Sequence, residues 1–251
     1  MLSKSQINLL KSLQHKKFRR EHGLFVVEGQ KSIVEFIDSA YQIEAIYHTT
    51  AFESKMLKLS QKINICEISV TELEKISSLK TPQEILALIK IPEWTSLDQK
   101  QLKGKFSLVL DGIQDPGNLG TIIRIADWFG IENIICSEDT VDAYNPKVVQ
   151  ACMGSLARVK LHYTALTDLL TKIKLPTFGA LLDGKNIYHT NFGQEGLIIM
   201  GNEGNGLRLE IQKLVNKAVT IPRTGKAESL NVAIATALFC SEITRVSPAN
   251  K

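Results

Sequence analysis

The chain has 251 residues, of which 44% are hydrophobic and 22% are charged, and its mean hydropathy is close to zero. This composition excludes an intrinsically disordered chain and is typical of a globular protein with one large domain or two smaller ones. The formal net charge is +4, and the whole excess lies in residues 1–105, which hold 16 Lys and Arg against 12 Asp and Glu, whereas residues 106–251 hold 14 of each.

The first 32 residues are the most basic stretch, with seven Lys and Arg and only two acidic residues. Their leucines are spaced for a helix that leads directly into an apolar strand, which favours a structural first helix over a mitochondrial transit peptide. Basic side chains on such a helix can neutralise nucleic-acid phosphates, although an ordinary solvated helix face has the same composition. The candidate phosphate contacts are Lys16, Lys17, Arg19 and Arg20.

Strand and helix patterns alternate through the first part of the chain. This alternation predicts a compact α/β domain over residues 1–95. The polar, proline-marked stretch that follows predicts a linker at residues 96–105. The expected strands lie at 24–29, 43–47, 63–68 and 85–89, and the expected helices lie at the basic start, near 33–37, near 51–60 and after Ser69 or Thr71.

The same alternation resumes in residues 106–251. Near-continuous apolar strands imply burial on both faces, which predicts a mostly parallel sheet with helices on both sides. A final helix at 229–244 is apolar almost all round, so it must be enclosed by its own sheet or by a second subunit. The expected strands lie at 106–110, 133–136, 159–161, 177–182, 197–200 and 218–221, with helices from 119, near 145–153, near 165–173 and near 208–214.

The cysteines and the apolar runs argue against several classes of protein. No C-x-x-C pair occurs, so neither a disulfide framework nor a zinc site is predicted and no metal is expected. No apolar run reaches the roughly 18 residues of a membrane span. A reducing cytoplasmic location fits these observations. The four cysteines are Cys66, Cys136, Cys152 and Cys240.

Three glycine-containing loops follow predicted strands, at 111–118, 201–206 and 222–229. Ligands collect at the carboxyl ends of parallel strands, so we expect the three loops to build one pocket. Taken singly, Asn118 is a helix cap, the second loop a flexible turn and Asn231 a surface residue. The chain has neither a G-x-G-x-x-G nor a G-x-x-x-x-G-K-[ST] motif, which argues against a nucleotide-dependent oxidoreductase.

Taken together, these loops resemble the SpoU family of RNA ribose methyltransferases, over roughly residues 106–246. The first part of the chain resembles the substrate-binding domain that accompanies some members, through Phe25-Val26-Val27-Glu28-Gly29 and Thr81-Pro82-Gln83-Glu84-Ile85-Leu86-Ala87. The matching blocks of the second part are Asp115-Pro116-Gly117-Asn118-Leu119-Gly120 with Arg124, Met200-Gly201-Asn202-Glu203-Gly204 with Gly206-Leu207, and Ile221-Pro222 with Gly225 and Ser229-Leu230-Asn231-Val232.

The resemblance implies an α/β SPOUT catalytic domain over residues 106–251 with a deep trefoil knot, preceded by a smaller L30e-like α/β domain. It also implies a homodimer that binds S-adenosyl-L-methionine in the knot. The family's catalytic and RNA-facing positions fall on Asn118, Arg124, Glu203, Ser229 and Asn231. The implied cofactor contacts, largely through main chain, fall on Leu181, Gly201, Ile221, Leu230 and Asn231. Arg223 and Ala233 depart from the residues that are frequent in the family.

The implied activity is methyl transfer to a ribose 2′-hydroxyl, with ribosomal RNA favoured over transfer RNA. The family's usual proposal makes Arg124 the general base, but a guanidinium has a pKa above about 12 and no free acceptor. Arg124 can instead hold the adjacent phosphate or stabilise the developing oxyanion. Asn118 and Asn231 can orient the ribose, with support from Ser229, and Glu203 can hold the arginine. A non-catalytic RNA-binding assembly factor with the same fold is the alternative.

Overall fold

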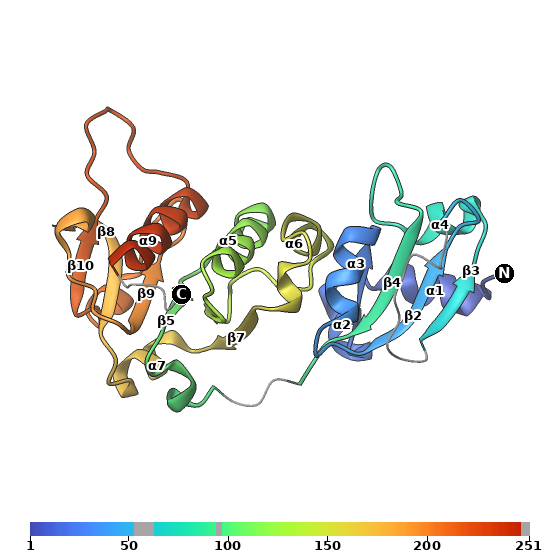
Figure 1. Cartoon of the computed structure of the whole chain (residues 1–251), viewed down its shortest axis with the longest axis horizontal. Helices are drawn as coiled ribbons and strands as arrows, with labels where there is room; N and C mark the ends of the chain where they lie inside the picture. The colour runs from blue at the N-terminus through green and yellow to red at the C-terminus, as the bar shows by residue number, and fades with distance from the viewer. Residues whose placement is uncertain (53–62, 94–96, 247–251) are drawn as a thin grey trace. The chain divides into compact units, whose positions relative to one another are not determined.

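The computed structural model describes residues 1–52, 63–93 and 97–246, and is drawn in Figure 1. The chain divides into two compact units. In the described part of the chain, none of the helices has the length and apolar character needed to span a membrane.

Unit 1 is built from two separate stretches of chain, Met1–Glu93 and Asp142–Arg158. Its sheet has four strands in the order β1-β4-β2-β3, in which β4 runs antiparallel to both neighbours and β3 runs parallel to β2. The predicted helix near 51–60 falls almost wholly within 53–62, outside the described residues. The elements of unit 1 are α1 (Lys4–Ser12), α2 (Lys16–His22), β1 (Leu24–Glu28), α3 (Gln30–Ile37), β2 (Ile43–His48), β3 (Asn64–Glu67), α4 (Val70–Ile76), β4 (Ile85–Lys90), α6 (Pro146–Ala151) and η3 (Ser155–Ala157).

The basic start of the chain forms two helices where the sequence predicts one. The side chain of Arg19, on α2, connects the two helices across the break. Its guanidinium is buried and donates to the carbonyl oxygens of Leu13 (2.8 Å) and Gln14 (2.9 Å), which follow the end of α1. The same guanidinium pairs with Asp142, with Nε 3.0 Å from Oδ2. Arg19 therefore stabilises unit 1 and is not a surface cation.

An aromatic cluster fills one side of the unit 1 sheet. The ring of Phe25, on β1, lies 5.8 Å from that of Phe36, 5.9 Å from that of Tyr41 and 4.7 Å from that of Tyr144. Tyr144 belongs to the second stretch of the unit, so residues 142–158 supply part of its core. The sequence gives no sign of this, because these residues lie among elements of the second half.

The Glu72 side chain joins α4 to the beginning of the chain. Its carboxylate accepts hydrogen bonds from the main-chain N–H of Leu2 (2.6 Å) and from the N–H and hydroxyl of Ser69 (both 2.9 Å). Ser69 also caps α4 and completes a capping box with Glu72. Ser69 is one of the two starts that the sequence predicts for this helix. These bonds, led by those from Ser69 and Leu2, lower the pKa of Glu72 from 4.5 to about 2.

We expect Glu72→Gln to flatten the acid end of the stability profile. Because the pKa is lowered on folding, the ionised carboxylate stabilises the fold above its ordinary pKa of 4.5, and this stabilisation is lost as the pH falls toward about 2. Urea midpoints followed by circular dichroism, between about pH 5 and pH 2, should fall less steeply in this variant. Glu74→Gln, an exposed change on the same helix, is the control. Parallel profiles for the two variants would contradict the assignment.

Unit 2, formed by Trp94–Val141 and Val159–Lys251, is built on a six-stranded sheet in the order β10-β8-β9-β5-β6-β7. Every pairing in it is parallel, as the apolar strands predict. The elements of unit 2 are η2 (Gln99–Leu102), β5 (Phe106–Leu110), α5 (Pro116–Trp128), β6 (Asn133–Ser137), β7 (Lys160–Thr164), α7 (Leu166–Lys172), β8 (Thr177–Asn186), η4 (Ile187–His189), β9 (Gly196–Met200), α8 (Leu209–Gln212), β10 (Lys217–Thr220) and α9 (Val232–Val246).

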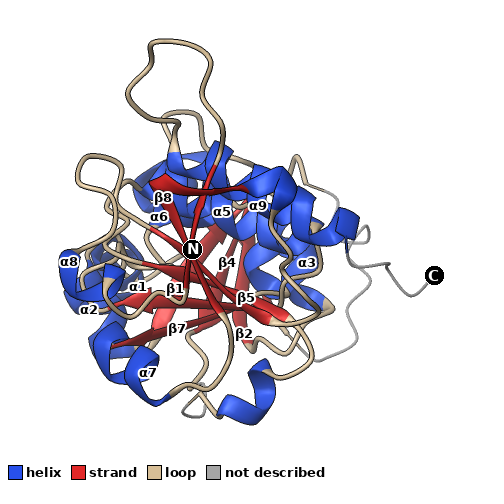
Figure 2. Cartoon of the chain, turned by 90° about the vertical axis from the view of Figure 1, so that its left-hand side faces the viewer, coloured by secondary structure: helices blue, strands red, loops and turns tan. Residues whose placement is uncertain are grey.

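Helices cover both faces of this sheet, as the sequence predicts. α5 and α9 pack against each other on one face, and α7 and α8 lie on the other, as Figures 1 and 2 show. The core beneath α7 and α8 contains Val109, Ile135 and Ile199 from the strands, with Leu170 and Ile211 from the helices. Because all these strands are parallel, their carboxyl ends lie at one edge of the sheet, from which the loops start.

A bulge interrupts β8 near its end. The ladder with β10 pairs Ala218 with Gly179 and then Val219 with Lys185, so the residues between Gly179 and Lys185 leave the pairing. A Cβ on Gly184 would lie 2.6 Å from the carbonyl carbon of Ala218, so the two backbones approach too closely for any other residue. The bulge presents Leu182 to solvent, with 74% of its surface exposed.

Candidate functional site

The three predicted loops lie at the carboxyl ends of β5, β9 and β10. The loop between β10 and α9, residues 221–231, projects from unit 2 in Figures 1 and 2. Side chains from all three segments meet: Asn118 Nδ2 donates to Glu203 Oε1 (2.8 Å), and Asn231 Nδ2 donates to Asn118 Oδ1 (2.9 Å). The structure therefore brings together three of the five candidate catalytic residues.

Asn118 is free to make these contacts because another residue caps its helix. α5 begins at Pro116, and Asp115 is the cap, accepting a hydrogen bond from the main-chain N–H of Asn118 (2.8 Å). The prediction of Asn118 as the cap is therefore wrong. An acidic residue followed by proline is a typical helix start, so the sequence contained this signal.

Asn231 has two roles at the start of α9. Its Oδ1 accepts from the main-chain N–H of Ala233 (2.9 Å) and of Ile234 (3.3 Å), while its Nδ2 reaches Asn118. The helix begins at Val232 and not at residue 229 as predicted. Capping thus fixes the orientation of the Asn231 side-chain amide, and this amide in turn orients the side chain of Asn118.

The second loop is closed tightly upon itself. The main chains of Asn202 and Gly206 exchange two hydrogen bonds, with N···O distances of 3.0 Å and 2.9 Å. A Cβ on Gly201 would lie 2.6 Å from the carbonyl oxygen of Gly206, and closer still to other atoms of the loop. Gly201 therefore allows the loop to fold back on itself, and Glu203 lies at its turn.

Arg124 and Ser229 lie apart from the hydrogen-bonded trio. Arg124 is on an exposed position of α5, and Ser229 is an exposed residue of the third loop. Within the described residues, neither side chain makes a hydrogen bond or an ion pair. Among the described residues the expected contact of Glu203 with the arginine is not formed; Glu203 Oε1 instead accepts from Asn118.

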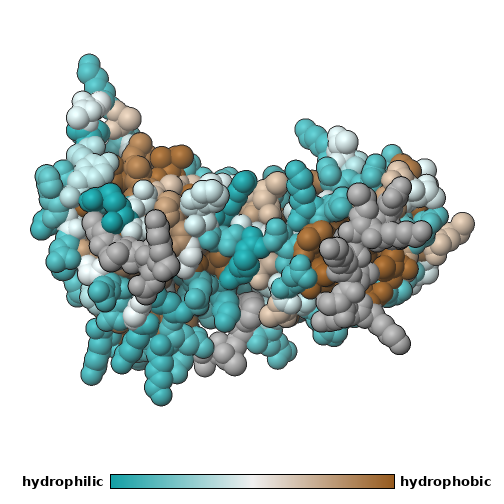
Figure 3. Space-filling view, in the orientation of Figure 1, coloured by the Kyte–Doolittle hydropathy of each residue, from teal (hydrophilic) through white to brown (hydrophobic). Residues whose placement is uncertain are grey.

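The candidate cofactor residues lie around the third loop and the bulge of β8. Leu181, Gly201 and Ile221 are partly buried, whereas Leu230 is 50% exposed. Figure 3 shows hydrophobic side chains gathered near α9 and this loop. Within the described residues, no main-chain N–H of 222–230 donates to a protein group. The segment therefore offers apolar side chains and free amides, which suit a ligand with an aromatic base and polar groups.

The candidate phosphate-binding residues separate into two groups. Lys16, Lys17 and Arg20 are exposed on α2. Arg19 is only 2% exposed and is bound to Asp142, so its guanidinium is not available to bind phosphate. Sequence reasoning missed this because its partner lies 123 residues away.

Two of the cysteines are buried in unit 2. Burial raises the pKa of Cys136 above its ordinary range, and raises that of Cys240 to about 12. Neither thiol is a nucleophile at neutral pH. Among the described residues, no cluster of His, Cys, Asp and Glu has the arrangement of a metal site.

Comparison with known proteins adds two family matches. Residues 105–241 match the SpoU rRNA Methylase family, and residues 4–87 match an MRM3-like substrate binding domain. The 23S rRNA (guanosine(2553)-2′-O)-methyltransferase RlmP of Bacillus subtilis is 30% identical over 235 residues, covering 91% of this chain and 92% of the relative.

Two solved structures are similar over nearly the whole chain. One, described as a candidate RNA methyltransferase of the TrmH family from Porphyromonas gingivalis, has 37% identity and a TM-score of 0.88, covering 98% of this chain and 100% of the other. An AdoMet-bound rRNA methyltransferase from Sinorhizobium meliloti has 25% identity and a TM-score of 0.86, covering 99% and 97%.

Proposed function

Because the chain belongs to the SpoU rRNA methylase family, we propose that it transfers a methyl group from S-adenosyl-L-methionine to a ribose 2′-hydroxyl of RNA. The proposal rests most on the contact of three loops through Asn118, Glu203 and Asn231, which are separated by up to 113 residues in the chain. A polar chain of this kind, at the carboxyl edge of a parallel sheet, is suited to orienting a substrate.

The cofactor would be held by the third loop and its neighbours, with main chain of Gly201, Ile221 and Asn231 and the side chains of Leu181 and Leu230. The exposed Leu230, together with the main-chain amides of 222–230 that have no partner among the described residues, supports this assignment. When bound, S-adenosylmethionine supplies a methyl group on a positively charged sulfur.

The chain's own residues would act on the ribose. The trio Asn118, Glu203 and Asn231 fixes the direction of its amide groups, so that they can orient the sugar hydroxyls. Arg124, which is exposed and has no protein partner among the described residues, would bind the adjacent phosphate and stabilise the developing 2′-oxyanion. Ser229 would hydrogen-bond the substrate beside it.

Ribosomal RNA is the proposed substrate, with transfer RNA as the alternative. The similar Bacillus subtilis protein acts on 23S rRNA, which supports the first choice. The reaction needs a 2′-hydroxyl, so RNA and not DNA would be modified. We assign RNA binding to the predicted first domain, residues 1–95, completed by residues 142–158 of unit 1, and catalysis to the remainder of residues 106–251. The predicted linker at 96–105 contains η2 and belongs to unit 2.

The test is direct transfer of a labelled methyl group. The full-length protein would be incubated with radiolabelled S-adenosylmethionine and with total RNA from cells that lack the gene. Digestion and mass spectrometry should then reveal a 2′-O-methylnucleoside in one rRNA fragment, and the matching fragment with a 2′-deoxyribose at that position should stay unmodified. Failure to bind S-adenosylmethionine in calorimetry would instead favour a non-catalytic RNA-binding factor.

We expect the change of Lys16, Lys17 and Arg20 to Ala to weaken RNA binding and to flatten its salt dependence. Each phosphate contact adds roughly 0.7–0.9 to the slope of log Kd against log salt, so the loss of three contacts should lower the slope by about two to three. S-adenosylmethionine affinity should not change. The charge-matched control changes three exposed lysines of unit 2, Lys100, Lys103 and Lys174, to Ala. Equal slopes for native protein and triple variant would remove α2 from the RNA-binding surface.

We further propose that the protein is a cytoplasmic homodimer and that its chain is threaded into a trefoil knot. Exposed apolar residues of unit 2 support the dimer: Ile234 on α9 is 54% exposed and Trp128 at the end of α5 is 84% exposed. Sedimentation equilibrium at several concentrations tests the dimer.

A further inference from the structure

Asp111 is a buried carboxylate at the edge of the proposed active site. It follows β5 directly, and its side chain has no exposed surface. Its main-chain N–H donates to the carbonyl oxygen of Met200 (2.9 Å), so the first and second loops leave the sheet side by side. A buried carboxylate is costly unless charged or hydrogen-bonded partners surround it.

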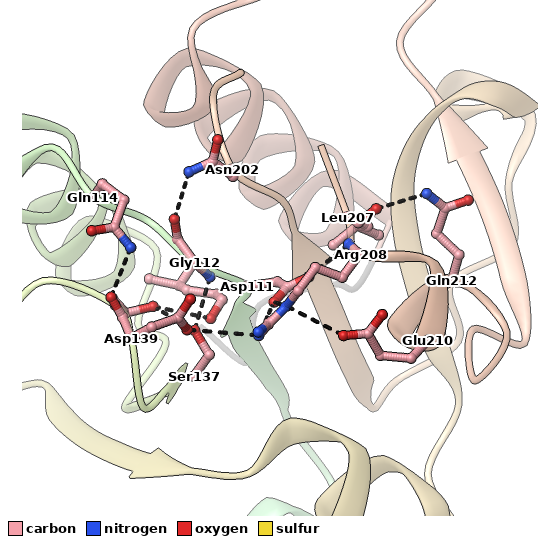
Figure 4. A network of polar contacts seen from close by, with 12 residues as sticks. Asp111, Gly112, Gln114, Ser137, Asp139, Asn202, Leu207, Arg208, Glu210 and Gln212 are labelled. Carbon is pink, nitrogen blue, oxygen red and sulfur yellow. Dashed lines mark hydrogen bonds and ion pairs between the residues drawn. The ribbon is translucent and has the colours of Figure 1, made fainter. Parts of the chain in front are cut away.

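Arg208 supplies these partners from the far end of the second loop. Its main-chain N–H donates to Asp111 Oδ2 (2.9 Å), its Nε donates to Asp111 Oδ1 (2.6 Å), and a terminal nitrogen also pairs with Oδ1. The hydrogen bond to Asp111 is the main reason that the pKa of Arg208 is raised. The guanidinium also lies 3.7 Å from Asp139 and 3.8 Å from Glu210. Figure 4 shows Arg208 at the centre of this network.

A second bridge joins the same two loops. Asn202 Nδ2 donates to the carbonyl oxygen of Gly112 (2.7 Å), and the N–H of Gly112 donates to Ser137 Oγ (2.8 Å), as Figure 4 also shows. The second loop is thus attached to the first at its beginning, through Asn202, and at its end, through Arg208.

Glu203 lies between these two attachments. Among the described residues its side chain makes one hydrogen bond, which it accepts from Asn118 (2.8 Å). The backbone at Glu203 is therefore held from both ends of its loop, and the Asn118 amide contacts both Glu203 and Asn231.

We propose that Asp111 and Arg208 are positioning residues for methyl transfer: their ion pair closes the second loop on the first and so places Glu203 against Asn118. This inference rests on the proposed function. Neither residue contacts the substrate in this scheme. Their effect passes through Glu203, which makes the inference testable by a double-mutant cycle.

The variant of choice is Arg208→Lys. Lysine keeps the positive charge that buried Asp111 requires, but it lacks the planar fork that makes two contacts at once. With saturating RNA and S-adenosylmethionine, we expect kcat to fall about tenfold while KM for RNA is retained. In a Glu203→Gln background, Arg208→Lys should have almost no further effect. Additive losses in kcat would overturn the proposal.

A second measurement does not depend on activity. Hydrogen–deuterium exchange of the full-length protein should show faster exchange of the amides of Asn202 and Gly206 in Arg208→Lys, with exchange in the sheet unchanged. Lys105→Gln is the matched control, because it removes an ion pair with Glu132 (2.7 Å) just before the opposite end of β5. Unchanged exchange in the second loop would overturn the proposal. Native protein without methyltransferase activity would overturn the proposed function, and the exchange result would still decide the role of the ion pair.

Discussion

Replacing Arg124 by Ala should lower kcat at least about 100-fold and leave the Kd for S-adenosylmethionine unchanged. Loss of one charged or hydrogen-bonding group that stabilises a developing oxyanion typically reduces turnover by about 10² to 10³. The exposed arginine has no protein partner among the described residues, so its removal should not change the unfolding midpoint. Single-turnover methylation and calorimetry measure the two effects. Arg245→Ala, which removes an arginine paired with Glu242 on α9, is the control.

The pH dependence of Arg124→Lys separates two roles of the arginine. If the residue stabilises charge, the lysine variant should keep part of the activity. The turnover of the native protein should then not rise tenfold per pH unit. If the arginine accepts the proton, turnover of the native protein should rise about tenfold per pH unit. A lysine variant that turns over as fast as the native protein would contradict both roles.

Gly201→Ala should lower both the folding stability and the rate of methyl transfer. The new Cβ would lie 2.6 Å from the carbonyl oxygen of Gly206, so the hydrogen-bonded closure of the second loop cannot persist. Overpacking of this kind costs about 1–3 kcal/mol of folding free energy, and we expect methyl transfer to fall at least about tenfold because Glu203 is displaced. Urea unfolding and the methylation assay measure the two consequences.

The second loop offers its own control for this change. At Gly204 the nearest atom to an added Cβ is Asn202 Oδ1 at 3.6 Å, an ordinary contact. Gly204→Ala should therefore retain stability and activity. If Gly201→Ala matched it in both measurements, the close approach within the loop would have no functional role.

Much of unit 2 is predictable because its strands are apolar over their whole length, a local pattern that indicates burial on both faces. The convergence of the loops at 118, 203 and 231 follows from the same topology, and the hydrogen bonds among Asn118, Glu203 and Asn231 confirm it. The roles of Arg124 and Ser229 stay predictions, because their proposed partners are substrate atoms.

Other features depend on partners that are far away in the chain. Nothing near Arg19 distinguishes it from Lys17, yet it is buried because Asp142 is 123 residues away. The importance of Arg208 likewise depends on Asp111, which is 97 residues away. A local pattern gives the charge of such a residue but not its partner, so sequence reasoning assigned Arg19 to the surface and passed over Arg208.

Because unit 1 is built from two stretches of chain, it cannot be transferred to another protein as one continuous segment. A fragment cut at the linker would lack Asp142 and Tyr144, leaving the Arg19 guanidinium without its carboxylate and one side of the Phe25 ring without a neighbour. The short stretch between β6 and β7 must therefore travel with the first 93 residues whenever this module is grafted onto another methyltransferase. Exchanging unit 1 without that stretch would leave its folded core incomplete.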